Sequence, residues 1–270
     1  MIKRNILFIL VLQLIFFKTG FCNERIVSLA PSLTKNIYIL HAEDKLVGCT
    51  SYCTIAVKDH KEVIGSAIAV NIEKTILLQP DLILATTITN PETIETFKKV
   101  GIKVIIFKTP VNFEEICSQF IDLGKITGTE KQASEIIGKT KQKLDSLKNT
   151  IPTGIKKKIF FQIGSNPVFT VLTNTFMDDF ISFAGGENIC ADLKRGTVSR
   201  EMVLLKNPDV IVISDMGGIG KQEMEIWNNY SDLNAVKNKN VFLVDSDKSC
   251  SPTPTDFISI LKVIINSINY

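Results

Sequence analysis

The stretch SREMVLLKNPDVIVI, at residues 199–213, decides the fold of this chain because the sequence contains a second version of it. Residues 71–84 read NIEKTILLQPDLIL, and an alignment without gaps places Glu73 opposite Glu201 and brings the two Pro-Asp pairs into register. Each copy predicts a short helix, a break and then a buried strand, because its closing apolar run is too short for a helix and lacks polar alternation. The repeat therefore predicts two α/β lobes built in the same way.

The ends of the two short helices follow from single residues. Asn71 and Ser199 are good N-cap residues, because their side-chain oxygens accept from the free N–H groups of a first helical turn. A glutamate two positions later lies favourably near the positive end of the helix dipole. Because a proline disfavours the helical conformation in the residue before it, Gln79 and Asn207 are predicted to end the helices.

Residues 1–22 predict an export signal peptide. A basic start precedes the apolar run 6–17, which is too short to span a bilayer and has the length of a signal-peptide core. Small residues at the recognition positions place cleavage before Asn23 and predict a periplasmic protein. The alternative is a lipoprotein anchored through an acyl chain on Cys22.

Charge and cysteine content limit the classes of function. The formal charge of +3 is accounted for by three basic residues of the leader, so the mature chain is near neutral and gives no support for nucleic-acid binding. The cysteines that remain after cleavage are Cys49, Cys53, Cys117, Cys190 and Cys250. An odd number in an oxidising compartment leaves at least one unpaired, and both Cys49–Cys53 and Cys190–Cys250 remain open as disulfides.

The order of the predicted elements gives an α/β fold with two Rossmann-like lobes and mostly parallel sheets. The longest helical pattern, residues 130–149, spans about 30 Å and joins the two copies of the repeat. We therefore expect a first lobe at 23–128, a single connecting helix within 129–151 and a second lobe at 152–270. A closing helix at 255–268 is predicted to be capped by Thr255.

Candidate ligand-binding residues follow the predicted strands, since open α/β sheets bind ligands at the carboxyl ends of their strands. Pro31 and Ser32 follow the first strand, and Tyr52 follows the second with an aromatic ring and a polar tip. In the second lobe, Asn166 lies in the loop after the strand at 159–163. The loop after the last strand, residues 245–254, contains Asp247 and Lys248.

The sequence contains no catalytic or metal-binding pattern that we could assign. His41 and His60 lie together in the first lobe without ligand spacing to any cysteine and without an obvious serine partner. The segment at 164–166 lacks the second glycine of a nucleophile elbow, and no P-loop or dinucleotide fingerprint is present. We interpret the chain as a binding protein without a cofactor, and keep an exported hydrolase that uses the histidines or a cleft cysteine as the alternative.

Several motifs together resemble the helical-backbone, or class III, substrate-binding proteins of ABC importers. They are RIVSLAPSLT at 25–34, LVGCTSYC at 46–53, the two Asn/Ser-x-Glu…Pro-Asp units, FQIGSNPVF at 161–169, AGGEN at 184–188 and VSRE at 198–201. The similarity covers essentially the whole mature chain and is closest to the vitamin B12 binding members, with iron-siderophore and haem binders as relatives. It implies a monomer that holds a small ligand between two lobes.

The resemblance also implies roles for particular residues. Glu73 and Glu201 correspond to the glutamates that dock onto arginines of the membrane permease, which works with its ATPase, and Tyr52 and Phe169 correspond to residues that face the ligand. The family's tryptophans have no counterparts here, since 66–68 reads SAI and 194–196 reads KRG. The cations Arg195 and Lys248 would suit an anionic iron chelate, so a ferric-siderophore or haem ligand is the alternative to a cobalamin-like one.

Overall fold

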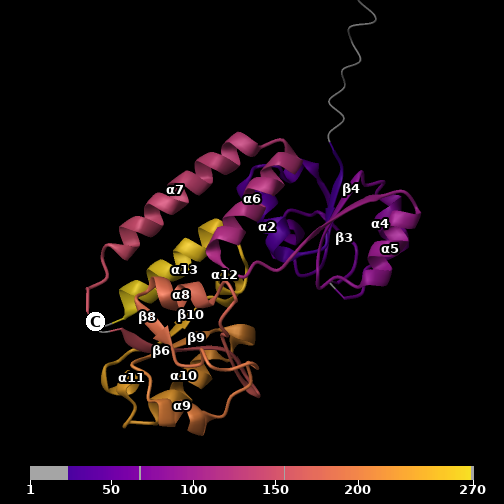
Figure 1. The fold of residues 1–270 in the computed structure, drawn as a ribbon. Helices are drawn as coiled ribbons and strands as arrows, with labels where there is room; N and C mark the ends of the chain where they lie inside the picture. Colours follow the sequence, from indigo (N-terminus) through magenta and orange to yellow (C-terminus); the bar gives the residue numbers. More distant parts are fainter. Residues whose placement is uncertain (1–23, 67, 155, 269–270) are drawn as a thin grey trace, which may run out of the picture.

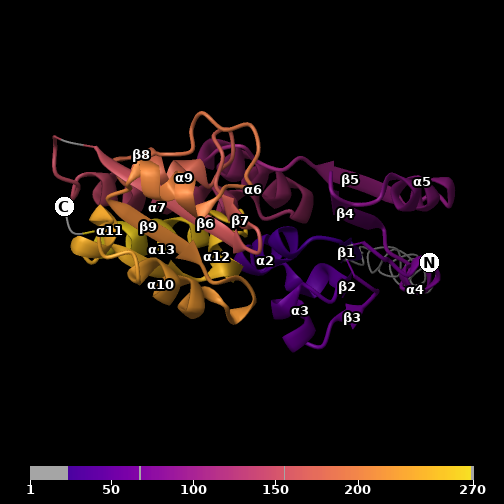
Figure 2. The same ribbon diagram turned by 90° about the horizontal axis from the view of Figure 1, so that it is seen from below.

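The computed structural model describes residues 24–66, 68–154 and 156–268 of the chain, and these residues form two α/β lobes (Figure 1). The view turned by 90° shows the lobes side by side (Figure 2). The predicted signal peptide, with Cys22, lies outside the described residues. Within the described ranges, no helix has the length and apolar character needed to cross a membrane.

The first lobe contains a sheet of five parallel strands in the order β3-β2-β1-β4-β5. The elements from this lobe through the connecting helix are β1 (Ile26–Ser28), α2 (Pro31–Ile39), the 3-10 turn η1 (Glu43–Lys45), β2 (Leu46–Cys49), α3 (Thr54–Lys58), β3 (Glu62–Val63), α4 (Ile72–Leu77), β4 (Leu82–Thr86), α5 (Pro91–Lys99), β5 (Lys103–Phe107), α6 (Phe113–Thr127) and α7 (Glu130–Lys148). The central strands β1 and β4 are buried almost throughout, which explains their unbroken apolar sequence.

The second lobe contains the strand order β10-β9-β6-β7, and β8 also pairs with β6. Its elements are β6 (Lys157–Ser165), β7 (Val168–Thr170), α8 (Asp178–Phe183), β8 (Gly186–Asn188), α9 (Arg200–Lys206), β9 (Val210–Ser214), the 3-10 turn η2 (Met216–Gly218), α10 (Gly220–Asn228), α11 (Asn234–Lys237), β10 (Val241–Val244), α12 (Ser246–Ser249) and α13 (Pro254–Ser267). All of these pairings are parallel except that of β6 with β7.

The repeat is visible in the backbone as well as in the sequence. Asn71 accepts a hydrogen bond from the N–H of Lys74, and Ser199 accepts one from Met202, so both predicted N-caps are confirmed. Gln79 and Asn207 both adopt left-handed conformations, with φ of 47° and 43°. A non-glycine residue rarely takes this conformation, and it occurs at the same place in both copies. The predicted end is confirmed for α9, whose C-cap is Asn207, whereas α4 is already capped by Leu78, one residue before Gln79.

The aspartate after each proline fixes the start of a neighbouring strand in the same way. Asp81 accepts a hydrogen bond from the N–H of Arg25 at 2.8 Å, and Asp209 accepts one from Lys158 at 2.9 Å. In return, the N–H groups of the two aspartates donate to the carbonyls of Arg25 and Lys158. The Pro-Asp pair therefore sets the register between the repeated strand and its neighbour in each lobe.

One hydrophobic core cluster contains residues of both lobes, and each lobe also has a separate cluster of its own. The chain passes from one sheet to the other through α7, and the C-terminal helix α13 packs against α6, α7 and α8 (Figure 1). Within this layer Phe257 stacks on Phe180 at a centroid distance of 4.4 Å and contacts Phe113 at 4.5 Å. The N–H of Phe113 also donates to Asp179 at 2.7 Å, where burial raises the pKa of the carboxyl. These contacts restrict relative movement of the lobes more than α7 alone would.

The structure corrects several predicted elements of the second lobe. The segment after residue 163 is not a loop but continues β6 and turns back as β7, and β8 was not predicted. The loop at 245–254 contains the short helix α12. The closing helix is capped by Thr253, which accepts from the N–H of Asp256, and not by Thr255, because Pro254 takes the first helical position.

Candidate ligand-binding cleft and outer helices

Large apolar side chains are exposed near the carboxyl ends of the parallel strands in both lobes. Tyr52 after β2 is 62% exposed and Ile88 after β4 is 72% exposed. In the second lobe Phe169 on the β6–β7 hairpin is 41% exposed and Met216 after β9 is 47% exposed. Exposed apolar groups that gather at a sheet's ligand-binding edge mark a candidate binding surface.

Phe169 and the segment that carries Arg195 lie against each other. The N–H of Thr170 donates to the carbonyl of Gly196 at 2.8 Å, and Phe169 forms a bridge with Thr197. A Cβ atom at Gly196 would lie 2.3 Å from the ring of Phe169, so only glycine allows the ring to approach this closely. The arrangement places the exposed Arg195 next in sequence to the residue under the aromatic ring.

The turn that carries Tyr52 rests on a buried group of thiols and hydroxyls. The Cys53 Sγ atom lies 3.1 Å from the Thr34 Oγ1 and 3.3 Å from the Thr50 Oγ1. Hydrogen bonding from the Cys49 thiol, and then from the two hydroxyls, holds the pKa of Cys53 below its ordinary value against the opposing effect of burial. Donating this bond, together with burial, raises the pKa of Cys49.

A lysine joins the predicted site residues of the two lobes. Lys35 on α2 lies 2.8 Å from the carboxylate of Asp247 on α12 and 3.3 Å from that of Asp256, and it also donates to the Asp247 carbonyl. Pro31 and Ser32 form the first turn of the same helix α2 and are half-buried. The carboxylate of Asp247 is therefore paired with the ammonium group of Lys35, although the Asp247 side chain is 61% exposed.

The remaining predicted site residues are exposed on the second lobe. Lys248 is exposed on α12, and its N–H donates to the capping Asp245. Asn166 is exposed at the tip of the β6–β7 hairpin. Sequence reasoning missed Ile88 and Met216, although their positions two residues after the buried strands β4 and β9 could have indicated them.

All five cysteines that the structure describes are free, and only Cys250 is exposed. Neither disulfide that the sequence left open is present. Within the same described ranges, no group of three or more histidine, cysteine, aspartate or glutamate residues could hold a metal ion.

The only tryptophan, Trp227, is fully buried and does not contribute to the strand-end surface. Its indole N–H donates to Gln162 at 2.7 Å, and Gln162 in turn donates to Glu223 at 2.8 Å. Arg200 forms an ion pair with Glu223 at 2.7 Å, and its guanidinium lies 4.8 Å from the ring centroid of Trp227. This network ties the first residue of α9 to β6 and α10.

Glu73 and Glu201 lie on the outside of the lobes at equivalent positions. Each is the second residue of its short helix, α4 or α9, and each is exposed. Hydrogen bonds from its own backbone N–H and from the Ser199 hydroxyl hold the pKa of Glu201 below its ordinary value. Figure 1 shows α4 and α9 at the outer ends of the two lobes.

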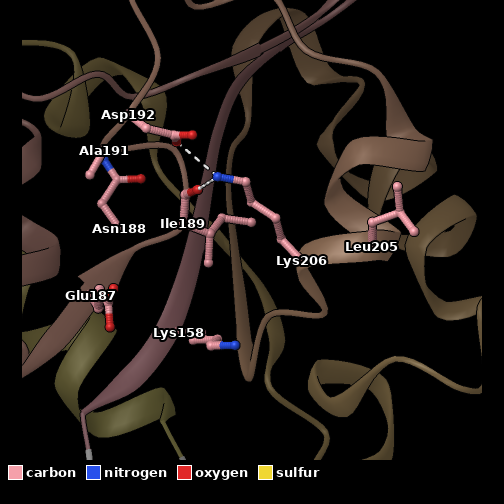
Figure 3. A pocket seen from close by; sticks show the side chains of 8 residues that line it. All are labelled: Lys158, Glu187, Asn188, Ile189, Ala191, Asp192, Leu205 and Lys206. Carbon is pink, nitrogen blue, oxygen red and sulfur yellow. Dashed lines mark hydrogen bonds and ion pairs between the residues drawn. The ribbon is translucent and has the colours of Figure 1, made fainter.

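One cavity of about 400 Å³ lies at the other end of the second sheet, between the start of β6, the end of β8 and the end of α9 (Figure 3). Its walls are formed by Lys158, Glu187, Asn188, Ile189, Ala191, Asp192, Leu205 and Lys206. Lys206 donates across it to the Ile189 carbonyl at 2.7 Å and forms an ion pair with Asp192 at 2.8 Å. Because the predicted ligand residues lie at the opposite strand ends, this cavity is separate from the candidate cleft.

Comparison with known proteins gives one family for nearly the whole chain. A family model described as a periplasmic binding protein matches residues 26–248. The ABC transporter substrate-binding lipoprotein YvrC of Bacillus subtilis, which is uncharacterised, is 32% identical over 83% of this chain and 73% of its own length. A vitamin B12-binding protein of Yersinia pestis is 33% identical over 71% of this chain and 69% of its own length.

The fold is also that of a solved structure with detectable sequence similarity. A possible iron-binding, periplasmic solute-binding protein from Staphylococcus epidermidis superposes with a TM-score of 0.79 at 29% identity. The match covers 92% of this chain and 99% of that protein.

Proposed function

The chain belongs to the periplasmic binding protein family, and from this premise we propose that it holds a cobalamin-like ligand between its two lobes and delivers it to the permease of an ABC importer. Members of this family bind substrates for transport and are not enzymes. The lobes at 23–128 and 152–270, joined by 129–151, are the two walls of the proposed cleft. The observation that carries the proposal is that each lobe exposes large apolar side chains near the carboxyl ends of its strands: Tyr52 and Ile88 in the first lobe, and Phe169 and Met216 in the second.

The cleft chemistry supports a ligand with a large apolar or aromatic surface. Tyr52 and Phe169 offer exposed rings from opposite lobes, and Ile88 and Met216 are exposed after the strands β4 and β9. A corrinoid presents a broad macrocycle that such side chains can cover, while Pro31, Ser32 and Asn166 supply smaller contacts at the rim. The 33% identity to a vitamin B12-binding protein supports the same ligand class.

A ferric siderophore or haem is the second candidate, because the second lobe also exposes cations. Exposed Arg195 directly precedes Gly196, which lies against the Phe169 ring, and exposed Lys248 lies on α12. Guanidinium and ammonium groups can pair with the carboxylates of haem or with an anionic iron chelate. The similarity to the Staphylococcus epidermidis protein, described as possibly iron-binding, supports this alternative.

The permease and its ATPase are the proposed partners, and Glu73 and Glu201 are the proposed docking residues. Their exposure, equivalent positions and separation from the strand-end surface support a role outside ligand binding. The protein is proposed to work as a monomer outside the cytoplasm. It is released by cleavage before Asn23 or, as the name of the lipoprotein YvrC suggests, anchored through Cys22.

The experiment that tests the ligand assignment is a titration of the purified mature protein with cyanocobalamin, haemin and a ferric siderophore, followed by absorbance and calorimetry. We expect saturable binding of cyanocobalamin, with affinity reduced at least tenfold by Phe169→Ala because the variant loses ring contact area. Ile106→Ala, which removes an exposed apolar side chain from the edge strand β5, is the control and should bind normally. Saturable binding of haemin or the siderophore alone would favour the second candidate, and no binding to any of the three would refute the proposal.

A further inference from the structure

The two docking helices each expose a leucine almost completely. Leu77 on α4 is 82% exposed and Leu205 on α9 is 87% exposed. Both occupy the same position in the repeat, four residues after Glu73 and Glu201. A single exposed leucine on a protein surface is ordinary. Two at equivalent positions of a repeat are not explained by packing, since neither contributes to a core cluster.

Helix geometry places each leucine beside its glutamate, because residues four apart are neighbours on one face of a helix. The lysine of each helix, Lys74 on α4 and Lys206 on α9, forms an ion pair and a hydrogen bond with other residues of its own lobe. Lys74 forms an ion pair with Glu62 and donates to the carbonyl of Val63 at 2.7 Å. Lys206 makes the corresponding kind of contact with Asp192 and the carbonyl of Ile189.

The glutamates themselves form no ion pair of this kind in the described part of the chain, although the charge of Arg200 acts on Glu201 and helps to lower its pKa. Among the described residues, no ion pair between side chains involves Glu73 or Glu201, and the nearby Arg200 is directed to the buried Glu223. Each helix therefore presents an anionic group and an apolar group together, and the lysine that could neutralise the patch is engaged elsewhere.

We propose that Glu73 with Leu77 and Glu201 with Leu205 form two like docking patches, in which the leucines are apolar anchors. The inference rests on the proposed function and specifies the partner's surface. The membrane permease would present the same pair of groups twice, a cation beside an apolar recess, once to each lobe. Burial of a leucine adds affinity that does not depend on salt, whereas the glutamate contact is screened by it.

The charges of the patches argue against two other occupants. A lipid surface with anionic headgroups would repel Glu73 and Glu201 just where the leucines would have to insert. A second copy of this chain meeting patch to patch would bring glutamates of like charge together. A partner that supplies cations beside its apolar surface satisfies both groups of each patch.

The test is the affinity of the full mature protein for its cognate permease–ATPase complex in nanodiscs. Leu77→Ala and Leu205→Ala should each weaken binding about tenfold, and the double variant about a hundredfold, because the two patches are independent. The loss should persist in about 0.5 M salt, whereas the loss caused by Glu73→Ala with Glu201→Ala should become smaller there. Binding of cyanocobalamin and haemin should be the same in the wild type and in every docking variant.

Matched controls separate the possible outcomes. Ile68→Ala with Val100→Ala removes two other exposed apolar side chains of the first lobe and should leave permease binding unchanged. Wild-type affinity of the leucine variants, with affinity lost in the glutamate variants, would overturn the inference and leave the proposed function intact. No binding of the wild type to the complex would overturn the proposed function. Equal binding to empty nanodiscs, or an equal loss in the control variant, would also overturn the inference.

Discussion

Helices α4 and α9 begin in the same way, yet the residue that follows each N-cap differs between them. In α4 this residue is Ile72, which packs on the apolar core of the first lobe. In α9 it is Arg200, which pairs with the buried Glu223 and lies over Trp227. The two helices share their N-caps, their Pro-Asp turns, and an exposed glutamate and leucine at equivalent positions. The two lobes thus keep a common outer framework while each stabilises it with different interior chemistry.

A second difference concerns the strand ends. The first lobe offers Tyr52 above buried thiols and hydroxyls, whereas the second offers Phe169 on an antiparallel hairpin over Gly196. The duplicated parts face outward, and the parts that differ line the proposed cleft. A partner with two like sites would recognise the duplicated outer parts. An asymmetric ligand would be recognised by the parts that differ between the lobes.

Substitution of the first residue of each helix, Ile72 in α4 and Arg200 in α9, should show the largest difference between the lobes in the free energy of unfolding. Arg200→Ala should lower the free energy of unfolding by about 2–3 kcal/mol, because it leaves the nearly buried carboxylate of Glu223 without its cation. Gln162 still donates to Glu223, which limits the loss. Ile72→Ala should cost about 1 kcal/mol, since its side chain is only partly buried. Urea unfolding of both variants measures these changes, and equal losses would contradict the difference drawn between the lobes.

The Pro-Asp turns should behave more alike. Asp81→Ala should cost about 1 kcal/mol through loss of the bond from the N–H of Arg25. Asp209→Ala should cost slightly more, about 1.5 kcal/mol, because Asp209 also accepts from Asn234 at 3.2 Å. The same urea titrations, with the exposed Asp232→Ala as a control that should change little, measure both. A cost confined to one lobe would show that the turns are not equivalent.

The sequence predicted the repeated units well because their signals are local. Asn71 and Ser199 act on the N–H groups of the next turn, and a proline restricts the residue immediately before it. The tie from Lys35 to Asp247 could not be predicted in this way, because 212 residues separate the two and no periodicity connects them. The hairpin that carries Phe169 was missed because its turn lies inside what reads as a loop after a strand.

The sequence indicated where candidate site residues lie along the chain, but it did not indicate the contacts that they make. The positions of Tyr52 and Phe169 followed from the order of strands and from the family resemblance. The contact between Phe169 and Gly196 depends on how two non-adjacent segments pack. The exposure of Leu77 and Leu205 was also not predicted, since an apolar residue in a short helix is normally assigned to the core.

The most direct test of the account compares the outer and inner surfaces in one titration. The affinity for cyanocobalamin is measured by calorimetry for the wild type, for Glu73→Ala with Glu201→Ala, and for Tyr52→Ala with Phe169→Ala. We expect the glutamate variant to bind as the wild type does and the aromatic variant to lose at least tenfold in affinity. A loss in the glutamate variant, or undiminished binding in the aromatic variant, would contradict the separation of docking face and ligand cleft.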